Sequence, residues 1–94
     1  MFSSRVCQMA RLMTGSDATD DQISQEYAAM LGSNRRVAAL RLDEAVRRCG
    51  LPFEQAWERA LKDFRELAAQ YRVSPATLFC LYLEWADANG VRLQ

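Results

Sequence analysis

The amino-acid sequence predicts an all-α protein, a single domain built as a bundle of about five helices. Three observations support this fold class. Apolar residues recur at three- and four-residue spacing along the chain, and stretches with the alternating pattern of strands do not stand out. The 2 prolines and 4 glycines lie where a helix would begin or end. The chain of 94 residues has the length of one domain, 1–94, in which residues 1–16 could form a loosely attached N-terminal helix.

The first two helices are predicted from their caps. The first is expected over about Ser3–Met13, with a serine at position 3 or 4 as its N-cap and Gly15 just beyond its end. The second should begin with Thr19-Asp20-Asp21-Gln22, which has the pattern of a capping box. Gly32 should end it. Its apolar face would consist of Ile23, Tyr27, Met30 and Leu31.

The third and fourth helices are predicted from their apolar stripes. The third should begin at Ser33 or Asn34 and end before Gly50, with a stripe of Ala38, Leu42, Ala45, Val46 and Cys49. The fourth should begin at Leu51-Pro52, because proline is tolerated in the first turn. Its stripe has the clearest helical spacing in the chain, and such a stripe is typical of a helix that faces a core. The stripe comprises Phe53, Trp57, Ala60, Leu61, Phe64, Leu67, Ala68 and Tyr71.

The fifth helix differs from the others because it is apolar on nearly every side. Ser74 should cap it, Pro75 should occupy its first position, and it should reach Asn89-Gly90. A helix that is apolar all round is buried all round. We expect one chain of this size to leave part of it uncovered, so that two copies pack across a two-fold axis. The expected interface consists of Leu78, Phe79, Tyr82, Leu83 and Trp85.

The C-terminal half also contains the pattern of a capped helical hairpin. Leu67-Ala68 lies one turn before Tyr71, and Val73 and Leu81 follow at positions suited to the angle between two helices. With these residues, 67–81 resemble the helix-turn-helix of phage-repressor-type DNA-binding proteins, so this half of the bundle is expected to be helix-turn-helix-like. The resemblance implies possible nucleic-acid contacts from Arg65, Arg72, Ser74 and Thr77, and a separate cluster of arginines adds Arg35 and Arg36 as possible contacts.

Two features depart from that family. Arg72 stands at the turn position that the family usually fills with glycine, so it must tolerate or avoid a left-handed backbone. The positions that would face DNA are Pro75, Ala76, Phe79, Cys80 and Tyr82. A helix that reads bases needs arginine, lysine or amide side chains there.

The charge balance also disfavours nucleic acid as the main partner. The chain carries 12 basic and 12 acidic residues, and phosphate neutralisation normally supplies most non-specific affinity for nucleic acid. Residues 33–48 contain five arginines, which leaves two interpretations open. They could form a local basic patch, or a solvated face with Asp43–Arg47 and Glu44–Arg48 pairs.

Composition argues against an enzyme or a metal site. The chain has no histidine, which removes the Ser–His and Cys–His nucleophile arrangements. Asp17-x-Thr19-x-Asp21 resembles the start of a calcium loop but lacks its glycine and final glutamate, so an acidic N-cap is the preferred interpretation. The 3 scattered cysteines favour reduced thiols in a cytoplasmic protein. No run of residues is long and apolar enough to span a membrane.

These observations together predict a small non-enzymatic regulatory or adaptor protein that acts by protein–protein binding. It should be a homodimer formed through the apolar C-terminal helix, and it could sequester a regulator such as a transcription factor. We expect no cofactor, no small-molecule substrate and no membrane partner. The alternative is a helix-turn-helix transcriptional regulator that binds DNA.

Overall fold

The computed structural model describes residues 2–91, and over that range it is helical with no strand. The helices are α1 (Ser4–Thr14), α2 (Asp20–Ala29), α3 (Gly32–Arg47), α4 (Phe53–Tyr71) and α5 (Pro75–Ala88). The predicted all-α bundle of five helices is therefore confirmed.

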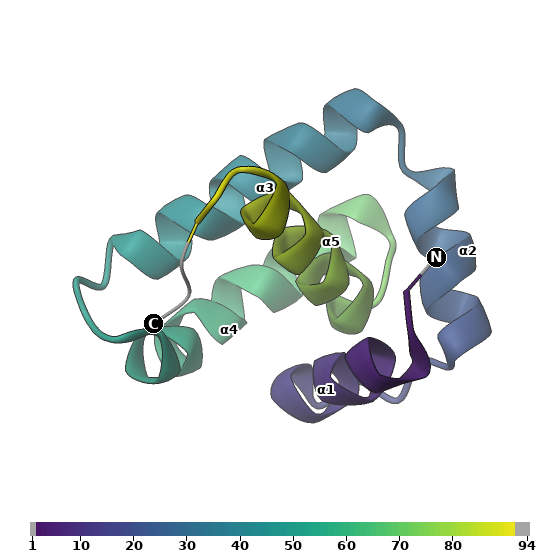
Figure 1. Ribbon diagram of the computed structural model, residues 1–94, viewed down its shortest axis with the longest axis horizontal. Helices are drawn as coiled ribbons and strands as arrows, with labels where there is room; N and C mark the ends of the chain where they lie inside the picture. The colour runs from purple at the N-terminus through teal and green to yellow at the C-terminus, as the bar shows by residue number, and fades with distance from the viewer. Residues whose placement is uncertain (1, 92–94) are drawn as a thin grey trace.

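The last helix, α5, lies in the middle of the molecule. It contacts each of the other four helices, and Figure 1 shows α3, α4, α1 and α2 arranged around it. The helices α3 and α4 also pack against each other, and α1 contacts α2. A helix that is apolar on nearly every side is buried by this arrangement, as its composition requires.

Side chains cap three of the helices, as their sequences predict. Ser3, Thr19 and Ser74 are the N-caps of α1, α2 and α5, and each side-chain oxygen accepts a hydrogen bond from the backbone N–H three residues later. The N-terminus of α5 receives a second acceptor from another helix. Glu26 of α2 accepts hydrogen bonds from the Ser74 N–H at 2.9 Å and the Thr77 hydroxyl at 2.8 Å. These bonds fix the start of α5 against α2.

The turn from α4 to α5 has left-handed backbone at a residue that is not glycine. Arg72 has φ 58° and ψ 42°. The N–H groups of Arg72 and Val73 donate to the carbonyls of Ala69 and Ala68, which is the Schellman arrangement that usually has glycine at the Arg72 position. Arg72 thus adopts the left-handed conformation that the sequence analysis left open.

The junction of α2 and α3 differs from the prediction. The helix α2 ends at Ala29, and Gly32 is the first residue of α3 rather than the end of α2. Met30 and Leu31 are both extended, with ψ of 130° and 153°, so the chain changes direction before the glycine. Leu31 consequently points away from the core and is exposed, which corrects its predicted place on the buried face of α2.

The first helix is part of the same core. Cys7, Ala10 and Thr14 are buried where α1 packs against α5. Its C-terminal end is held by α4, because the Trp57 indole N–H donates to the Met13 carbonyl at 2.9 Å and Arg65 donates to the Thr14 carbonyl at 3.1 Å. None of the helices in residues 2–91 has the length and apolarity needed to cross a membrane.

Candidate functional site

The residues predicted to form a dimer interface are mostly buried inside the chain itself. Leu78, Phe79 and Tyr82 are 0%, 2% and 0% exposed. The prediction that one chain leaves this part of α5 uncovered is wrong, because four helices surround it. Leu83 and Trp85 remain partly exposed, and Leu83 lines a small apolar hollow beside Phe2 and Val6 of the N-terminal region.

The buried aromatic rings of α5 belong to a cluster with α4. The Trp57 ring makes edge-to-face contacts with Phe64 and Phe79, at centroid distances of 4.4 and 4.9 Å. Phe64 contacts Tyr82 in the same way at 5.8 Å. The Tyr82 hydroxyl donates to Asp43 of α3 at 3.1 Å. Burial, together with the negative charge of Asp43, raises the pKa of Tyr82 far above its ordinary value. Phe79 and Tyr82 therefore join α5 to α3 and α4.

The residues proposed to contact nucleic acid have structural partners in several cases. Thr77 is buried, Ser74 caps α5, and Arg65 holds the end of α1. Four of the positions that would face DNA, Ala76, Phe79, Cys80 and Tyr82, are at most 2% exposed. Side chains buried in this way cannot reach a base edge while α5 keeps its place. Arg72 is exposed, and Arg35 and Arg36 lie elsewhere, on α3.

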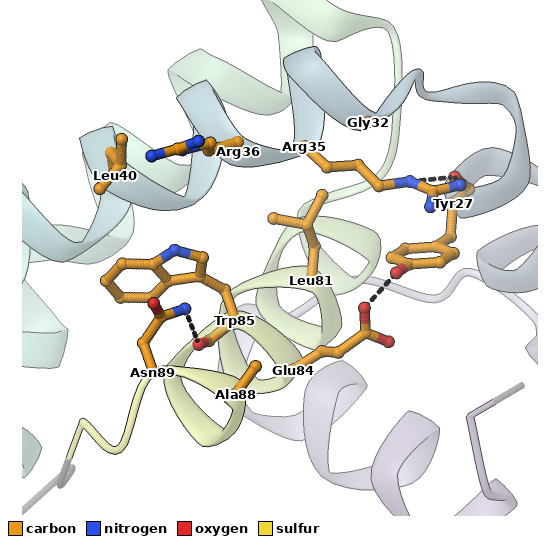
Figure 2. A pocket seen from close by; sticks show the side chains of 10 residues that line it. All are labelled: Tyr27, Gly32, Arg35, Arg36, Leu40, Leu81, Glu84, Trp85, Ala88 and Asn89. Carbon is orange, nitrogen blue, oxygen red and sulfur yellow. Dashed lines mark hydrogen bonds between the residues drawn. The ribbon is translucent and has the colours of Figure 1, made fainter.

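The C-terminal half of α5 is left uncovered along one side, where it forms a groove with α3 and the end of α2. The groove has a volume of about 380 Å³. It is lined by Tyr27, Gly32, Arg35, Arg36, Leu40, Leu81, Glu84, Trp85, Ala88 and Asn89, which are drawn in Figure 2. Gly32 to Leu40 on α3 and Leu81 to Asn89 on α5 each cover eight residue steps, or about 12 Å of helix.

One end of the groove is closed by side chains that bind one another. The Arg35 guanidinium lies 3.9 Å above the centre of the Tyr27 ring and donates to the Tyr27 carbonyl at 2.7 Å. The Tyr27 hydroxyl donates to Glu84 of α5. Burial and this carboxylate raise the pKa of Tyr27. Tyr27, Arg35 and Glu84 thus form a hydrogen-bonded cluster that ties α2, α3 and α5 together at this end, as Figure 2 shows.

The other end of the groove is open and combines apolar and cationic side chains. Arg36 and Leu40 face it from α3, and Trp85 faces it from α5 (Figure 2). Leu40 is 49% exposed, and Trp85 is partly exposed. The Trp85 indole stacks on the buried Tyr82 ring at a centroid distance of 6.1 Å. The backbone carbonyl of Trp85 accepts a hydrogen bond from the Asn89 side-chain amide at 2.8 Å. The indole is therefore supported on the core side and accessible on the groove side.

No protein-family model, curated protein or solved structure matches this chain. The groove must therefore be interpreted from its own residues.

Part of this site was predicted from the sequence. Trp85, Arg35 and Arg36 were predicted binding residues, but the arginines were expected to contact nucleic acid and were not connected with Trp85. Leu40 was not predicted, although a signal was present. Val37 and Leu40 lie off the apolar stripe of α3, and they are 48% and 49% exposed. Tyr27, Glu84 and Asn89 were not predicted to line a site, because the groove depends on how α2, α3 and α5 pack.

The arginine cluster of α3 divides into residues with different partners. Arg47 pairs with Asp43 at 2.7 Å, as predicted for a solvated face. The predicted pair of Glu44 with Arg48 is not formed in the described part of the chain. Arg35 is engaged with Tyr27, whereas Arg36 lines the groove and extends along α3 toward Leu40.

Metal ligation has no candidate in residues 2–91. No group of three or more cysteine, aspartate and glutamate side chains with suitable geometry lies within this range. The 3 cysteines are free, and Cys7 and Cys80 are buried between α1 and α5. Burial raises the pKa of the Cys80 thiol to about 12, so this thiol is protonated at neutral pH.

Proposed function

We propose that this protein is a non-enzymatic protein-binding module whose groove between α3 and α5 holds a short segment of another protein. One observation carries the proposal. A partly exposed indole, Trp85, lies across from a half-exposed Leu40 at the place where the other helices leave α5 uncovered. An apolar side chain of the partner would be buried between them.

The composition of the groove supports a protein partner. Tryptophan, tyrosine and arginine are the residues most enriched at the energetic centres of protein interfaces, and the groove contains each of them. Two further apolar side chains of α3 and its N-cap are exposed outside the groove, Val37 at 48% and Leu31 at 69%. About 12 Å of groove accommodates two turns of a helix or three to four residues of extended chain.

The partner and the site differ from those expected from the sequence. We do not propose a homodimer held through Leu78, Phe79 and Tyr82, because these residues are buried. For the same reason we do not propose that α5 reads DNA. We propose that the protein sequesters a regulatory protein, and that the groove binds it. Three free thiols suit a reducing compartment such as the cytoplasm.

Absence of catalysis remains part of the proposal. Without histidine in the chain, a general base would have to be a carboxylate or another less common group. The carboxylate that lines the groove, Glu84, accepts the Tyr27 hydroxyl, and Glu26 caps α5. Both have structural partners that account for their positions.

A random-peptide library panned against the full chain tests the proposal. We expect a family of enriched sequences that share an apolar anchor. Leu40→Glu should weaken the binding of a peptide from this family by at least about tenfold, because it places a charge in an apolar contact. Affinity would be measured by calorimetry with synthetic peptide.

A matched control is available on α1. Leu12 is 85% exposed and does not line the groove, so Leu12→Glu makes the same chemical change elsewhere. We expect this variant to bind the peptide as the wild type does. Failure to enrich any sequence family, or equal binding to the Leu40→Glu variant and the wild type, would overturn the proposed function.

A further inference from the structure

The two arginines that line the groove have different surroundings. Arg35 stacks on the Tyr27 ring and donates two hydrogen bonds to its carbonyl, at 2.7 and 3.2 Å. Arg36 is exposed, and within residues 2–91 it forms no hydrogen bond or ion pair. Arg35 therefore has a structural role, and the guanidinium of Arg36 is available to a ligand.

The sequence of α3 explains why Arg36 has no acidic neighbour. Residues three or four positions apart are adjacent on a helix surface. For Arg36 these are Gly32, Ser33, Ala39 and Leu40, none of which is acidic. Arg47 illustrates the contrast, because Asp43 lies four residues before it and pairs with it.

The rest of the groove does not neutralise Arg36 either. Glu84 is the acidic residue among those that line the groove, and it accepts the Tyr27 hydroxyl at the closed end. The open end consequently carries one unbalanced positive charge beside apolar walls. A bound segment would exclude water from this charge, and an unpaired charge that loses water is costly. A carboxylate removes that cost and forms a strong charge-assisted hydrogen bond with a guanidinium.

We infer that the segment held in the groove carries an aspartate or glutamate side chain close to its apolar anchor, and that Arg36 binds this carboxylate. The inference rests on the proposed function. Arg36 and Leu40 are one turn apart, about 6 Å along α3. The carboxylate and the anchor should therefore lie three or four residues apart in a helical segment, or two apart in an extended one.

A protein carboxylate fits these surroundings better than a nucleic-acid phosphate. Nucleic-acid affinity comes from several phosphates neutralised together. The groove supplies one available guanidinium, and the chain as a whole has a net charge of zero. An apolar anchor beside a single carboxylate matches the pairing of Trp85 and Leu40 with Arg36.

Peptides from the panned library provide the test. They would be synthesised with an amidated C-terminus, so that side chains carry the only carboxylates. Replacing the acidic residue nearest the anchor by its amide should lower affinity by about tenfold, the loss expected for one charge-assisted hydrogen bond. Raising the salt concentration from about 0.05 to 0.5 M should lower the affinity of the acidic peptide more than that of the amide peptide, because salt screens exposed charges.

Arg36→Gln links this loss to the proposed contact. The variant should bind the acidic peptide as weakly as the wild type binds the amide peptide, and the two changes together should cause no further loss. Arg41→Gln is the matched control, because Arg41 is an exposed arginine of α3 that does not line the groove. Far-UV circular dichroism of both variants would establish that they fold.

The outcomes separate the two proposals. If acidic and amide peptides bind equally well and Arg36→Gln has no effect, while Leu40→Glu still weakens binding by at least about tenfold, the inference is overturned and the proposed function stands. Displacement of the peptide by a DNA oligonucleotide would overturn the choice of a protein carboxylate. If Leu40→Glu has no effect on binding, or no peptide family is enriched, both proposals fall.

Discussion

At the scale of single residues, Glu26 connects α2 to the start of the central helix. Burial alone would raise the pKa of this carboxyl group, but hydrogen bonds from the Ser74 N–H, the Thr77 hydroxyl and Gln22 outweigh it and lower the pKa. The carboxylate also lies at the positive end of the α5 dipole, which favours its charged form. Ser74 as an N-cap could be predicted from local sequence. The contribution of Glu26 could not, because 48 residues separate it from Ser74.

Glu26→Gln tests this contact. The amide keeps the shape but accepts weaker hydrogen bonds, so the free energy of unfolding at pH 7 should fall by about 1–3 kcal/mol. A lowered folded pKa means that the stabilisation is complete above the ordinary glutamate value of 4.5 and is lost as pH falls through the folded pKa. Urea unfolding of both proteins at several pH values should show the difference shrink in acid.

The matched control for this measurement is Glu58→Gln. Glu58 is an exposed residue of α4, so its replacement should change stability by less than about 0.5 kcal/mol. A stability gap between wild type and Glu26→Gln that stays constant down to pH 3 would contradict the proposed role of the charge.

At the scale of elements, the turn between α4 and α5 stores conformational strain. Arg72 adopts a left-handed conformation that side chains other than glycine and asparagine disfavour, at a cost of about 1 kcal/mol. Arg72 is exposed, so its side chain contributes little packing to offset the strain.

Arg72→Gly should therefore stabilise the protein by about 0.5 kcal/mol, because relief of strain exceeds the added entropy of the unfolded chain. The midpoint of urea unfolding measures this change. Ala69→Gly is the matched control, since Ala69 is exposed within α4, where glycine should cost about 1 kcal/mol. Destabilisation by both substitutions would show that Arg72 makes a contact worth more than its strain.

The helices themselves were largely predictable, because their signals are local. Capping side chains, the proline at the start of α5 and the apolar stripe of α4 all act within a few residues. The junction at Met30 and Leu31 was not predictable in the same way. Gly32 suggested a helix end, but its backbone begins α3 instead, and the extended conformation of the two preceding residues depends on how α2 and α3 pack.

At the scale of the whole molecule, the placement of α5 decides which surfaces are available for binding. Its composition correctly indicated burial on nearly every side, but the sequence could not reveal what covers it. Four helices of the same chain do so, and Phe79 and Tyr82 became core residues. The side of α5 that carries Trp85 stays uncovered and lines a groove with the exposed Arg36 and Leu40 of α3. The candidate site is thus a consequence of packing, and only its separate residues were visible in the sequence.

Phe79→Ala distinguishes a core role from the interface role first predicted for this residue. Removing a buried aromatic ring costs about 3–5 kcal/mol, out of a total stability of about 5–14 kcal/mol for a domain of this length. A core residue stabilises one chain, so the urea midpoints of wild type and variant should not change with protein concentration over a tenfold range.

Phe79→Leu, which keeps most of the side-chain volume, should cost about 1–2 kcal/mol and can be measured if the alanine variant does not fold. Leu12→Ala, at an exposed position on α1, should change stability by less than about 0.5 kcal/mol. If the wild-type midpoint rises with protein concentration and Phe79→Leu abolishes that rise, the ring stabilises an assembly, and its place in the core of a single chain would be refuted.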